Sequence, residues 1–146
     1  MNYVEHFSED DFAEILSLYK SVDWLVYTRE PEQLKTAFRN STYVCLAREG
    51  TRLVGCIRSI SDDVSIHYVQ DILVHPDVQR GGVGRALIER SLRRFTHVRT
   101  HLLLTDDEER QRHFYRSVGY HNTKEIQEFC FNVFLQMKGV SFSSAV

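Results

Sequence analysis

The sequence predicts an α/β protein of the α+β type, with helices on both faces of a mixed, mostly antiparallel central sheet that contains one parallel βαβ unit. Two observations carry this fold class. Two apolar, valine-containing segments flank the short polar stretch 49–51, which is typical of an antiparallel hairpin. After residue 82 the apolar spacing changes from strand-like to helical, and it becomes strand-like again at 98, which indicates two parallel strands joined by a helix.

The N-terminal part is predicted to hold two helices. Ser8 precedes an acidic turn and then apolar residues at helical spacing, so it is the expected N-cap of the first helix. Pro31 suits the first turn of the second helix. We expect an aromatic loop between them, over residues 23–28, and a short strand at 3–6.

Strand and helix patterns alternate along the rest of the chain. Gly119 is placed where a left-handed residue would end the last helix. We predict strands at 43–48, 52–60, 66–74 and 98–104, helices at about 84–95 and 107–118, and a last strand within 125–135.

The composition describes one ordinary globular domain of 146 residues, with 26% charged and 42% hydrophobic residues. We expect a single domain over 1–138 and a flexible tail over 139–146. No apolar run approaches the roughly 20 residues that cross a bilayer, so we expect a cytoplasmic protein. With 18 basic and 20 acidic residues, neither nucleic acid nor a membrane surface is an expected partner.

Metal and disulfide chemistry are not expected either. The cysteines at 45, 56 and 130 are odd in number and widely spaced. Only His97 and His101 are four residues apart, and they fall on a loop and a strand rather than on one helical face. We therefore expect reduced thiols and no metal cofactor.

The turn between the strand ending at Val74 and the following helix carries the most informative motif. Main-chain amides in the first turn of a helix lack intrahelical acceptors, and glycine lets a phosphate come close to them. The sequence therefore favours an anion-binding turn, although a turn that only reverses the chain is the alternative. Its residues are Gln79, Arg80, Gly81, Gly82, Val83, Gly84 and Arg85.

Two other glycine motifs do not fit this turn. The nucleotide-binding loop needs lysine and serine or threonine after its last glycine, whereas Arg85 and Ala86 follow Gly84. The dinucleotide fingerprint needs a third glycine at Leu87.

The spacing of Gln79, Gly82 and Gly84 resembles the acetyl-CoA signature of the GNAT superfamily of N-acetyltransferases. The resemblance extends over nearly the whole chain, to a helix that ends in the segment 114–120. It implies direct transfer of acetyl from acetyl-CoA to a primary amine, without a covalent enzyme intermediate. It also implies that the strands carrying Val74 and Leu102 splay apart and that the pantetheine arm enters the gap. Leu73 and Val74 would then offer main-chain groups to that arm, and the anion-binding turn would hold the pyrophosphate.

By the same resemblance Tyr115 is the general acid. A tyrosinate is a stronger base than a thiolate, so full proton donation is uphill by about 2 kcal/mol, and stabilisation of the departing thiolate by a hydrogen bond is the better description. The alternative is a packing aromatic at a helix end. The family often has asparagine seven residues before this tyrosine, where this chain has Glu108.

The general base is not evident from the sequence. Related enzymes often carry glutamate or histidine in the strand before the signature, where this chain has Tyr68 and Gln70. Asp71 lies on the opposite face of a regular strand and would need a bulge to reach the same pocket, so a structural role is favoured. We favour a base acting through ordered water, with Tyr68, Gln70 or Glu128 as polar anchors.

Trp24, Tyr27, Tyr68 and Gln70 are the candidate residues for binding the acceptor amine, because aromatic faces attract cations. Trp24 is equally interpretable as a core residue. The arginines at 90, 93 and 94 are interpreted as a solvated helix face, with contact to the 3′-phosphate of coenzyme A as the alternative.

The sequence therefore predicts an N-acetyltransferase acting on a small-molecule amine, which the near-neutral charge favours over a basic protein. A non-catalytic acyl-CoA-binding sensor, and an acetyltransferase of protein lysines or N-termini, are the alternatives. A homodimer formed through the apolar last strand is implied only by analogy.

Overall fold

The computed structural model describes residues 1–126 and 132–143. The chain divides into two compact units, residues 1–107 and residues 108–146, and each is described by itself. Glu128, a candidate polar anchor, and Cys130, one of the three cysteines, lie outside the described residues.

The first unit is built on a five-stranded sheet in the order β1-β2-β3-β4-β5. Neighbouring strands are antiparallel except β4 and β5, which are parallel, so the predicted mixed sheet and βαβ unit are confirmed. The strands are β1 (Asn2–Val4), β2 (Tyr43–Glu49), β3 (Arg52–Ser61), β4 (Ile66–Val74) and β5 (Thr100–Leu103).

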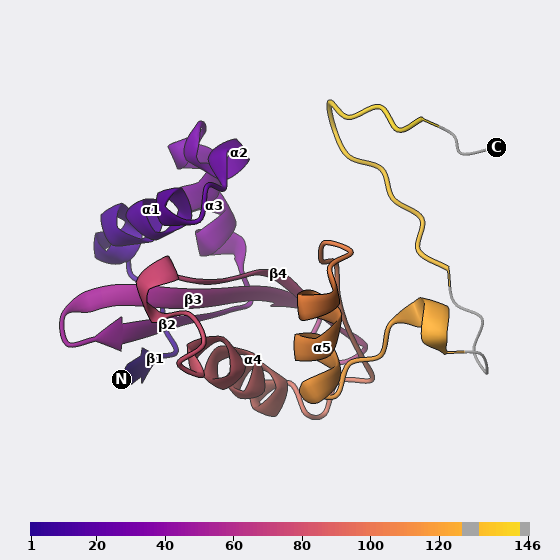
Figure 1. The fold of residues 1–146 in the computed structure, drawn as a ribbon. Coiled ribbons are helices and arrows are strands. Elements are labelled where there is room, and N and C mark those ends of the chain that lie inside the picture. Colours follow the sequence, from indigo (N-terminus) through magenta and orange to yellow (C-terminus); the bar gives the residue numbers. More distant parts are fainter. Residues whose placement is uncertain (127–131, 144–146) are drawn as a thin grey trace. The chain divides into compact units, whose positions relative to one another are not determined.

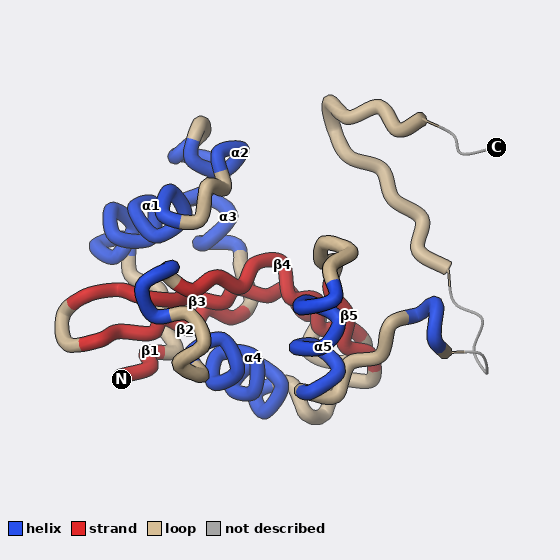
Figure 2. Tube along the Cα trace, in the orientation of Figure 1, coloured by secondary structure: helices blue, strands red, loops and turns tan. Residues whose placement is uncertain are grey.

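Helices cover both faces of this sheet. Figures 1 and 2 show α1, α2 and α3 on one face and α4 on the other. The helices are η1 (Glu9–Asp11), α1 (Phe12–Ser21), α2 (Leu25–Thr28), α3 (Pro31–Asn40), η2 (Pro76–Val78) and α4 (Val83–Arg94).

Two N-terminal predictions need correction. Ser8 does cap a helix, through a capping box with Asp11, but that helix is the single 3₁₀ turn η1, and α1 begins only at Phe12. The predicted loop at 23–28 contains the short helix α2. The reason is tertiary packing, since the rings of Trp24 and Tyr27 both pack edge-on against Tyr19 of α1.

Each face of the sheet carries its own core. Gly55 of β3 lets α4 approach closely, because a Cβ there would lie 3.1 Å from Val83 Cγ1 and 3.3 Å from Leu87 Cδ1. This approach places the start of α4, and the turn before it, against the end of β4. The core on the opposite face joins α1 and α3 to the sheet through Phe12, Ile15, Leu18, Tyr19, Leu34, Phe38, Val44, Leu46, Leu53, Cys56 and Leu73.

The second unit contains α5 (Glu109–Ser117) and the 3₁₀ turn η3 (Thr123–Glu125). Gly119 has a φ of +98°, which confirms the predicted left-handed end of the helix. The predicted strand within 125–135 is wrong for its described part, where Glu125 closes η3 and residues 132–135 have no regular structure. An ion pair between Arg116 of α5 and Glu125 stabilises that turn.

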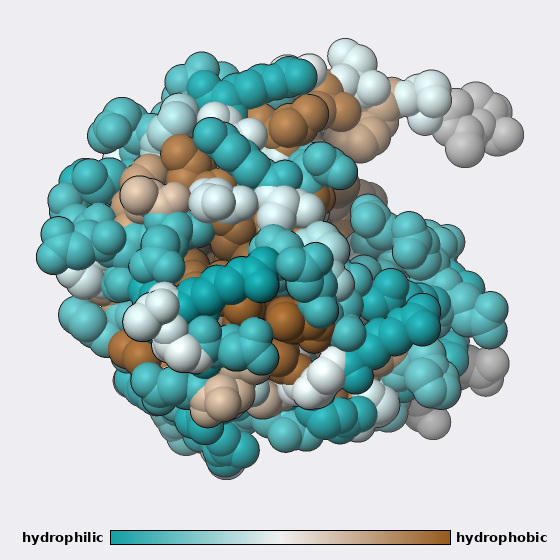
Figure 3. Space-filling view, turned by 60° about the vertical axis from the view of Figure 1, so that its left-hand side comes forward, coloured by the Kyte–Doolittle hydropathy of each residue, from teal (hydrophilic) through white to brown (hydrophobic). Residues whose placement is uncertain are grey.

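Polar side chains cover most of the face drawn in Figure 3, with apolar residues visible between them. Over the described ranges 1–126 and 132–143, no helix is long and apolar enough to cross a membrane.

Candidate active site

Among the described strands, none pairs with the second half of β4 on the side of β5. The β4–β5 pairing runs from Ile66–Thr100 to Val69–Leu103, where β5 ends, whereas β4 continues to Val74 beside β3. Within the described sheet, residues 70–74 therefore have an edge that an extended ligand can join by main-chain hydrogen bonds. Leu73 and Val74 lie in this half, and the carbonyl of Val74 already accepts a hydrogen bond of 3.1 Å from the Gln79 side chain.

The turn that follows is shaped to receive an anion. Arg80 and Gly82 have φ values of +67° and +82°, and Gly82 is the N-cap of α4. Apart from Gly82 and its two chain neighbours, no heavy atom of the described residues lies within 4 Å of where a Cβ on Gly82 would be, so the space beside this glycine is open. The first-turn amides of Val83 and Gly84 have no intrahelical acceptor, and the helix dipole adds positive potential. These residues fit a pyrophosphate.

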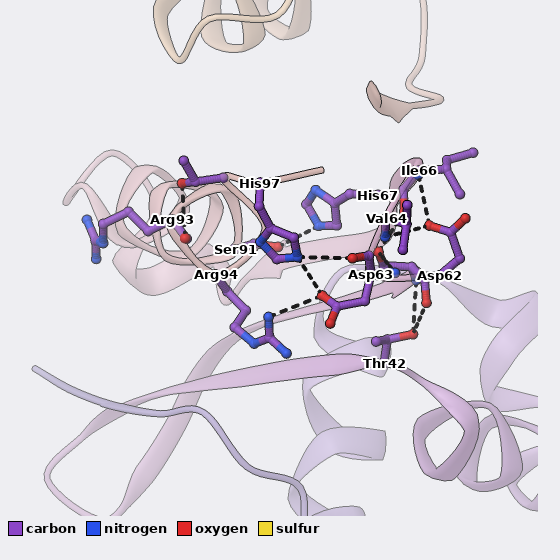
Figure 4. A network of polar contacts seen from close by, with 12 residues as sticks. Thr42, Asp62, Asp63, Val64, Ile66, His67, Ser91, Arg93, Arg94 and His97 are labelled. Carbon is purple, nitrogen blue, oxygen red and sulfur yellow. Dashed lines mark hydrogen bonds and ion pairs between the residues drawn. The ribbon is translucent and has the colours of Figure 1, made fainter. Parts of the chain in front are cut away.

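Two of the arginines farther along α4 have partners within the protein. Arg90 pairs with Glu5 at 3.2 Å, and its guanidinium lies 4.5 Å from the centroid of the Tyr3 ring. Arg94 pairs with Asp63 at 3.4 Å, as Figure 4 shows. These ion pairs are partly exposed, which agrees with the interpretation of the arginine cluster as a solvated helix face.

Strand β4 contains a bulge, which the sequence analysis did not foresee. Arg58 of β3 is opposite Asp71, but the next residue, Ser59, is opposite Val69, so Gln70 is extra in β4. The bulge reverses the faces, because His67 contacts α4 whereas Asp71 contacts α1. A bulge is the condition that the sequence analysis set for Asp71 to leave the opposite face of the strand, and with this bulge Asp71 lies on the face that contacts α1.

Asp71 is held in a buried ion pair. It is 2% exposed, and its Oδ2 accepts a hydrogen bond of 2.6 Å from Arg58 Nε and one of 2.8 Å from the Tyr19 hydroxyl. Arg58 is itself only 5% exposed. Burial and the neighbouring Asp71 raise the pKa of Tyr19 well above its ordinary value, so this hydroxyl stays protonated. The structural role expected for Asp71 agrees with this geometry.

Gln70, the extra residue of the bulge, contacts Tyr27, and both are candidate acceptor-binding residues. Gln70 Nε2 donates a hydrogen bond of 3.2 Å to the hydroxyl of Tyr27, and the Trp24 ring lies 5.9 Å from the Tyr27 ring. Both rings are half-buried and pack on the core, so Trp24 contacts the core while part of it stays exposed. Burial raises the pKa of Tyr68, and the negative charge of Asp71 raises it further.

A second buried polar cluster lies under α4, where β4 meets β5. His67 is fully buried, with Nδ1 2.9 Å from His101 Nδ1 and Nε2 2.9 Å from the Ser91 hydroxyl; Figure 4 shows the ring of His67 directed toward Ser91. Because the two Nδ1 atoms face each other, they can hold only one proton between them. Burial, and then the nearby His101, lower the pKa of His67 to about 4.

This histidine pair predicts loss of stability in acid. An unfolded histidine takes up a proton below about pH 6.5, whereas folded His67 does so only near pH 4. The contribution of His67 to the free energy of unfolding is therefore fully present above pH 6.5, and the free energy of unfolding falls by up to about 3 kcal/mol as the pH is lowered to 4. Urea unfolding at pH 7 and pH 4.5 measures the effect. His67→Gln should reduce the pH dependence and His6→Gln, at an exposed histidine, should not; an equal dependence in all three proteins would contradict this prediction.

Sequence reasoning missed Tyr19, Arg58, His67 and Ser91 as members of polar clusters. Arg58 did carry a signal, since it is the one charged residue in the apolar stretch 53–60. The histidine pair carried none, because it depends on the register of β4 against β5.

In the second unit, Tyr115 lies near the end of α5. Its ring contacts those of Phe114 and Tyr120, with centroids 5.0 and 6.0 Å away, and its carbonyl accepts from the amide of Tyr120 at 3.0 Å. Glu108 is the N-cap of α5, and its side chain makes no capping hydrogen bond. Throughout the described ranges, no group of three or more histidine, cysteine, aspartate or glutamate side chains could hold a metal ion.

Comparison with known proteins agrees with this architecture. The sequence profile of the acetyltransferase (GNAT) domain matches residues 8–140. The uncharacterized N-acetyltransferase ycf52 of Porphyra purpurea is 25% identical over 122 residues, which are 81% of this chain and 69% of that protein. A GNAT family acetyltransferase of Streptococcus pneumoniae TIGR4 superposes with a TM-score of 0.79 and 28% identity, covering 94% of this chain and 98% of the other. An aminoglycoside acetyltransferase from an uncultured soil sample, solved with sisomicin, has a TM-score of 0.65 and 21% identity, covering 92% and 96% of the two chains.

Proposed function

The chain belongs to the GNAT acetyltransferase family, and from that premise we propose that it transfers acetyl from acetyl-CoA directly to the primary amine of a small molecule. The observation that carries the proposal is the open turn at Gly82, which lies between the unpartnered half of β4 and the N-terminus of α4.

Acetyl-CoA supplies the thioester carbonyl and coenzyme A as the leaving group. The amides at the start of α4 bind its pyrophosphate, and the free edge of β4 bonds to the pantetheine arm. Arg80 and Arg85 add positive charge at the rim of the turn. The proposed cofactor-binding residues are Leu73, Val74, Gln79, Arg80, Gly81, Gly82, Val83, Gly84 and Arg85.

The reaction has two proton requirements. The amine nitrogen attacks the carbonyl carbon, a C–N bond forms as the C–S bond breaks, the nitrogen loses a proton and the thiolate gains one. An alkylamine with a pKa of about 10.4 is neutral only once in about 2,500 molecules at pH 7, a cost of about 4.6 kcal/mol that ordered water or a base must offset. Tyr115 donates a hydrogen bond to the departing sulfur.

The acceptor is proposed to be a small organic amine that binds beside Trp24, Tyr27, Tyr68 and Gln70. The aromatic surface supports this choice, because cationic amines bind favourably to aromatic faces. The fold shared with an aminoglycoside acetyltransferase adds aminoglycosides to the candidates. The sensor and the protein-directed acetyltransferase are the competing hypotheses.

The test is release of free thiol from acetyl-CoA in the presence of polyamines, aryl-alkyl amines, aminoglycosides, amino acids and lysine peptides. We expect turnover with at least one small amine and little with peptides. Turnover with peptides alone would support a protein-directed enzyme. Saturable binding of acetyl-CoA without turnover of any acceptor would support the sensor.

A further inference from the structure

His75, the residue between β4 and η2, binds both main-chain amides at the start of that short helix. Its own amide donates to the carbonyl of Val54 in β3 at 2.7 Å, which fixes His75 to the sheet. Its Nδ1 accepts a hydrogen bond of 3.2 Å from the amide of Asp77, and its carbonyl accepts one of 3.0 Å from the amide of Val78. Pro76 has no N–H group. His75 is therefore the N-cap of η2 through both its side chain and its main chain.

This cap defines the state of the His75 ring. Because Nδ1 accepts a hydrogen bond, it carries no proton, and the ring proton is on Nε2. Arg52 Nη2 lies 3.3 and 3.2 Å from the two ring nitrogens, so it lies above the ring plane rather than along the lone pair of either nitrogen. The same Nη2 pairs with Asp77 Oδ2 at 3.0 Å. Arg52 thus packs on the ring while Nδ1 stays directed at the amide of Asp77.

Gln79 closes the other end of η2. Its amide donates to the carbonyl of Pro76 at 3.5 Å, and its side chain donates to the carbonyl of Val74 at 3.1 Å. The segment 75–79 is therefore bonded at both of its ends. The first-turn amides of α4, which are proposed to bind the pyrophosphate, follow a few residues later. Their position depends on how this segment is held against the sheet.

The turn between η2 and α4 needs such support. Arg80 and Gly82 have φ values of +67° and +82°, and for a non-glycine residue such as Arg80 this conformation is unfavourable. An unfavourable backbone conformation persists only where the surrounding structure fixes it. The start of α4, packed closely on Gly55, fixes the turn on one side. The His75 cap fixes it on the other.

We propose that His75 is a positioning residue for coenzyme A, which holds the anion-binding turn in its phosphate-binding conformation by capping η2 through Nδ1. The inference rests on the proposed function, because it takes the pyrophosphate to be the group that the turn binds. His75 acts through the turn and not on the reacting atoms. A turn that is ordered before the cofactor arrives binds it more tightly, so the cap affects cofactor affinity rather than the chemical step.

Three substitutions separate the cap from the other contacts of this segment. His75→Leu removes the acceptor Nδ1 and keeps an apolar side chain. His75→Asn keeps an acceptor, and the chain already uses asparagine in this way, since Asn122 Oδ1 accepts from the amide of Lys124 at the start of η3 at 3.0 Å. Asp77→Ala keeps the capped amide and removes the ion pair with Arg52, which is about half exposed and contributes little.

Isothermal titration calorimetry with coenzyme A measures the effect. We expect His75→Leu to bind about 3- to 10-fold more weakly than the parent, the range of a lost helix cap, and His75→Asn and Asp77→Ala to bind within twofold of it. His75→Ala also lacks the acceptor and should match His75→Leu. Unchanged binding by His75→Leu would overturn the proposal. A loss of the same size in His75→Asn or Asp77→Ala would overturn it too, because the acceptor Nδ1 would not be the cause.

Ser8→Ala is the matched control for stability. Ser8 caps η1, another single 3₁₀ turn, by accepting a hydrogen bond of 3.3 Å from the amide of Asp10. Thermal unfolding should show similar destabilisation of Ser8→Ala and His75→Leu, whereas only His75→Leu should bind coenzyme A more weakly. Equal weakening in Ser8→Ala would show that general destabilisation causes the loss, and would refute the positioning role.

Kinetics distinguish positioning from catalysis. With an amine that supports turnover, we expect His75→Leu to raise the KM for acetyl-CoA about 3- to 10-fold and to leave kcat within twofold. A fall in kcat of the same size at unchanged KM would place His75 in the chemical step and overturn the proposal.

The two hypotheses can fail separately. Weaker binding of coenzyme A by His75→Leu, without release of thiol from acetyl-CoA with any amine, would refute the proposed function but keep the positioning role of His75. Thiol release with an unchanged KM for acetyl-CoA in His75→Leu would keep the function and refute the positioning role.

Discussion

Gly82→Asp is expected to weaken binding of coenzyme A and acetyl-CoA at least about 100-fold, or roughly 2.7 kcal/mol. The space above Gly82 is open, so the new side chain enters the volume where the pyrophosphate would lie. It also brings a negative charge close to the phosphates, and two like charges about 4 Å apart near a protein surface repel by about 4 kcal/mol. Isothermal titration calorimetry measures the loss.

Two control variants separate the causes of this loss. Gly82→Asn has nearly the same size without the charge, so the difference between the two variants gives the electrostatic part. Gly50→Asp introduces the same residue in the β2–β3 hairpin, where φ is +61° and the surrounding space is equally open. It should leave coenzyme A binding within twofold, because it places aspartate in the same left-handed backbone conformation but outside the turn that precedes α4. Micromolar binding by Gly82→Asp would refute the placement of the pyrophosphate.

The elements that were predicted well depend on local signals. The bounds of β4 and the start of α3 at Pro31 match the prediction, because the apolar alternation ends before Pro76 and proline favours a first helical turn. The left-handed glycine after α5 is also local. Such features need no knowledge of distant contacts, so one sequence is enough to find them.

The features that were missed depend on contacts distant in sequence. The bulge at Gln70 is a shift in the register of β3 against β4 between Arg58 and Ser59, and no residue type in β4 indicates it. The short helix α2 forms where Trp24 and Tyr27 pack on Tyr19. Both features change the candidate acceptor site, since they bring the side chain of Gln70 to the hydroxyl of Tyr27. Sequence reasoning therefore predicts the local conformation of the turn before α4 better than the side-chain contacts around Tyr27.

Tyr115→Phe is expected to lower kcat about 100-fold while the KM for acetyl-CoA changes less than threefold. The hydroxyl is proposed to bond to sulfur only as negative charge develops there, so its loss affects the transition state more than the bound substrates. A factor of 100 corresponds to about 2.7 kcal/mol, at the lower end of what a positioned acid contributes. Steady-state thiol release measures both constants. The phenyl ring preserves the contacts with Phe114 and Tyr120, so the fold of α5 should be kept.

Tyr120→Phe is the matched control for this variant. Its hydroxyl is buried and makes no hydrogen bond within the described residues, and its ring lies 6.0 Å from that of Tyr115. Removing a buried hydroxyl without a partner should leave kcat unchanged and leave the protein equally or slightly more stable. If the two variants lose activity equally, Tyr115 acts through packing at the end of α5. If only Tyr115→Phe loses activity at unchanged thermal stability, the lost group is a hydroxyl that acts on the leaving thiolate.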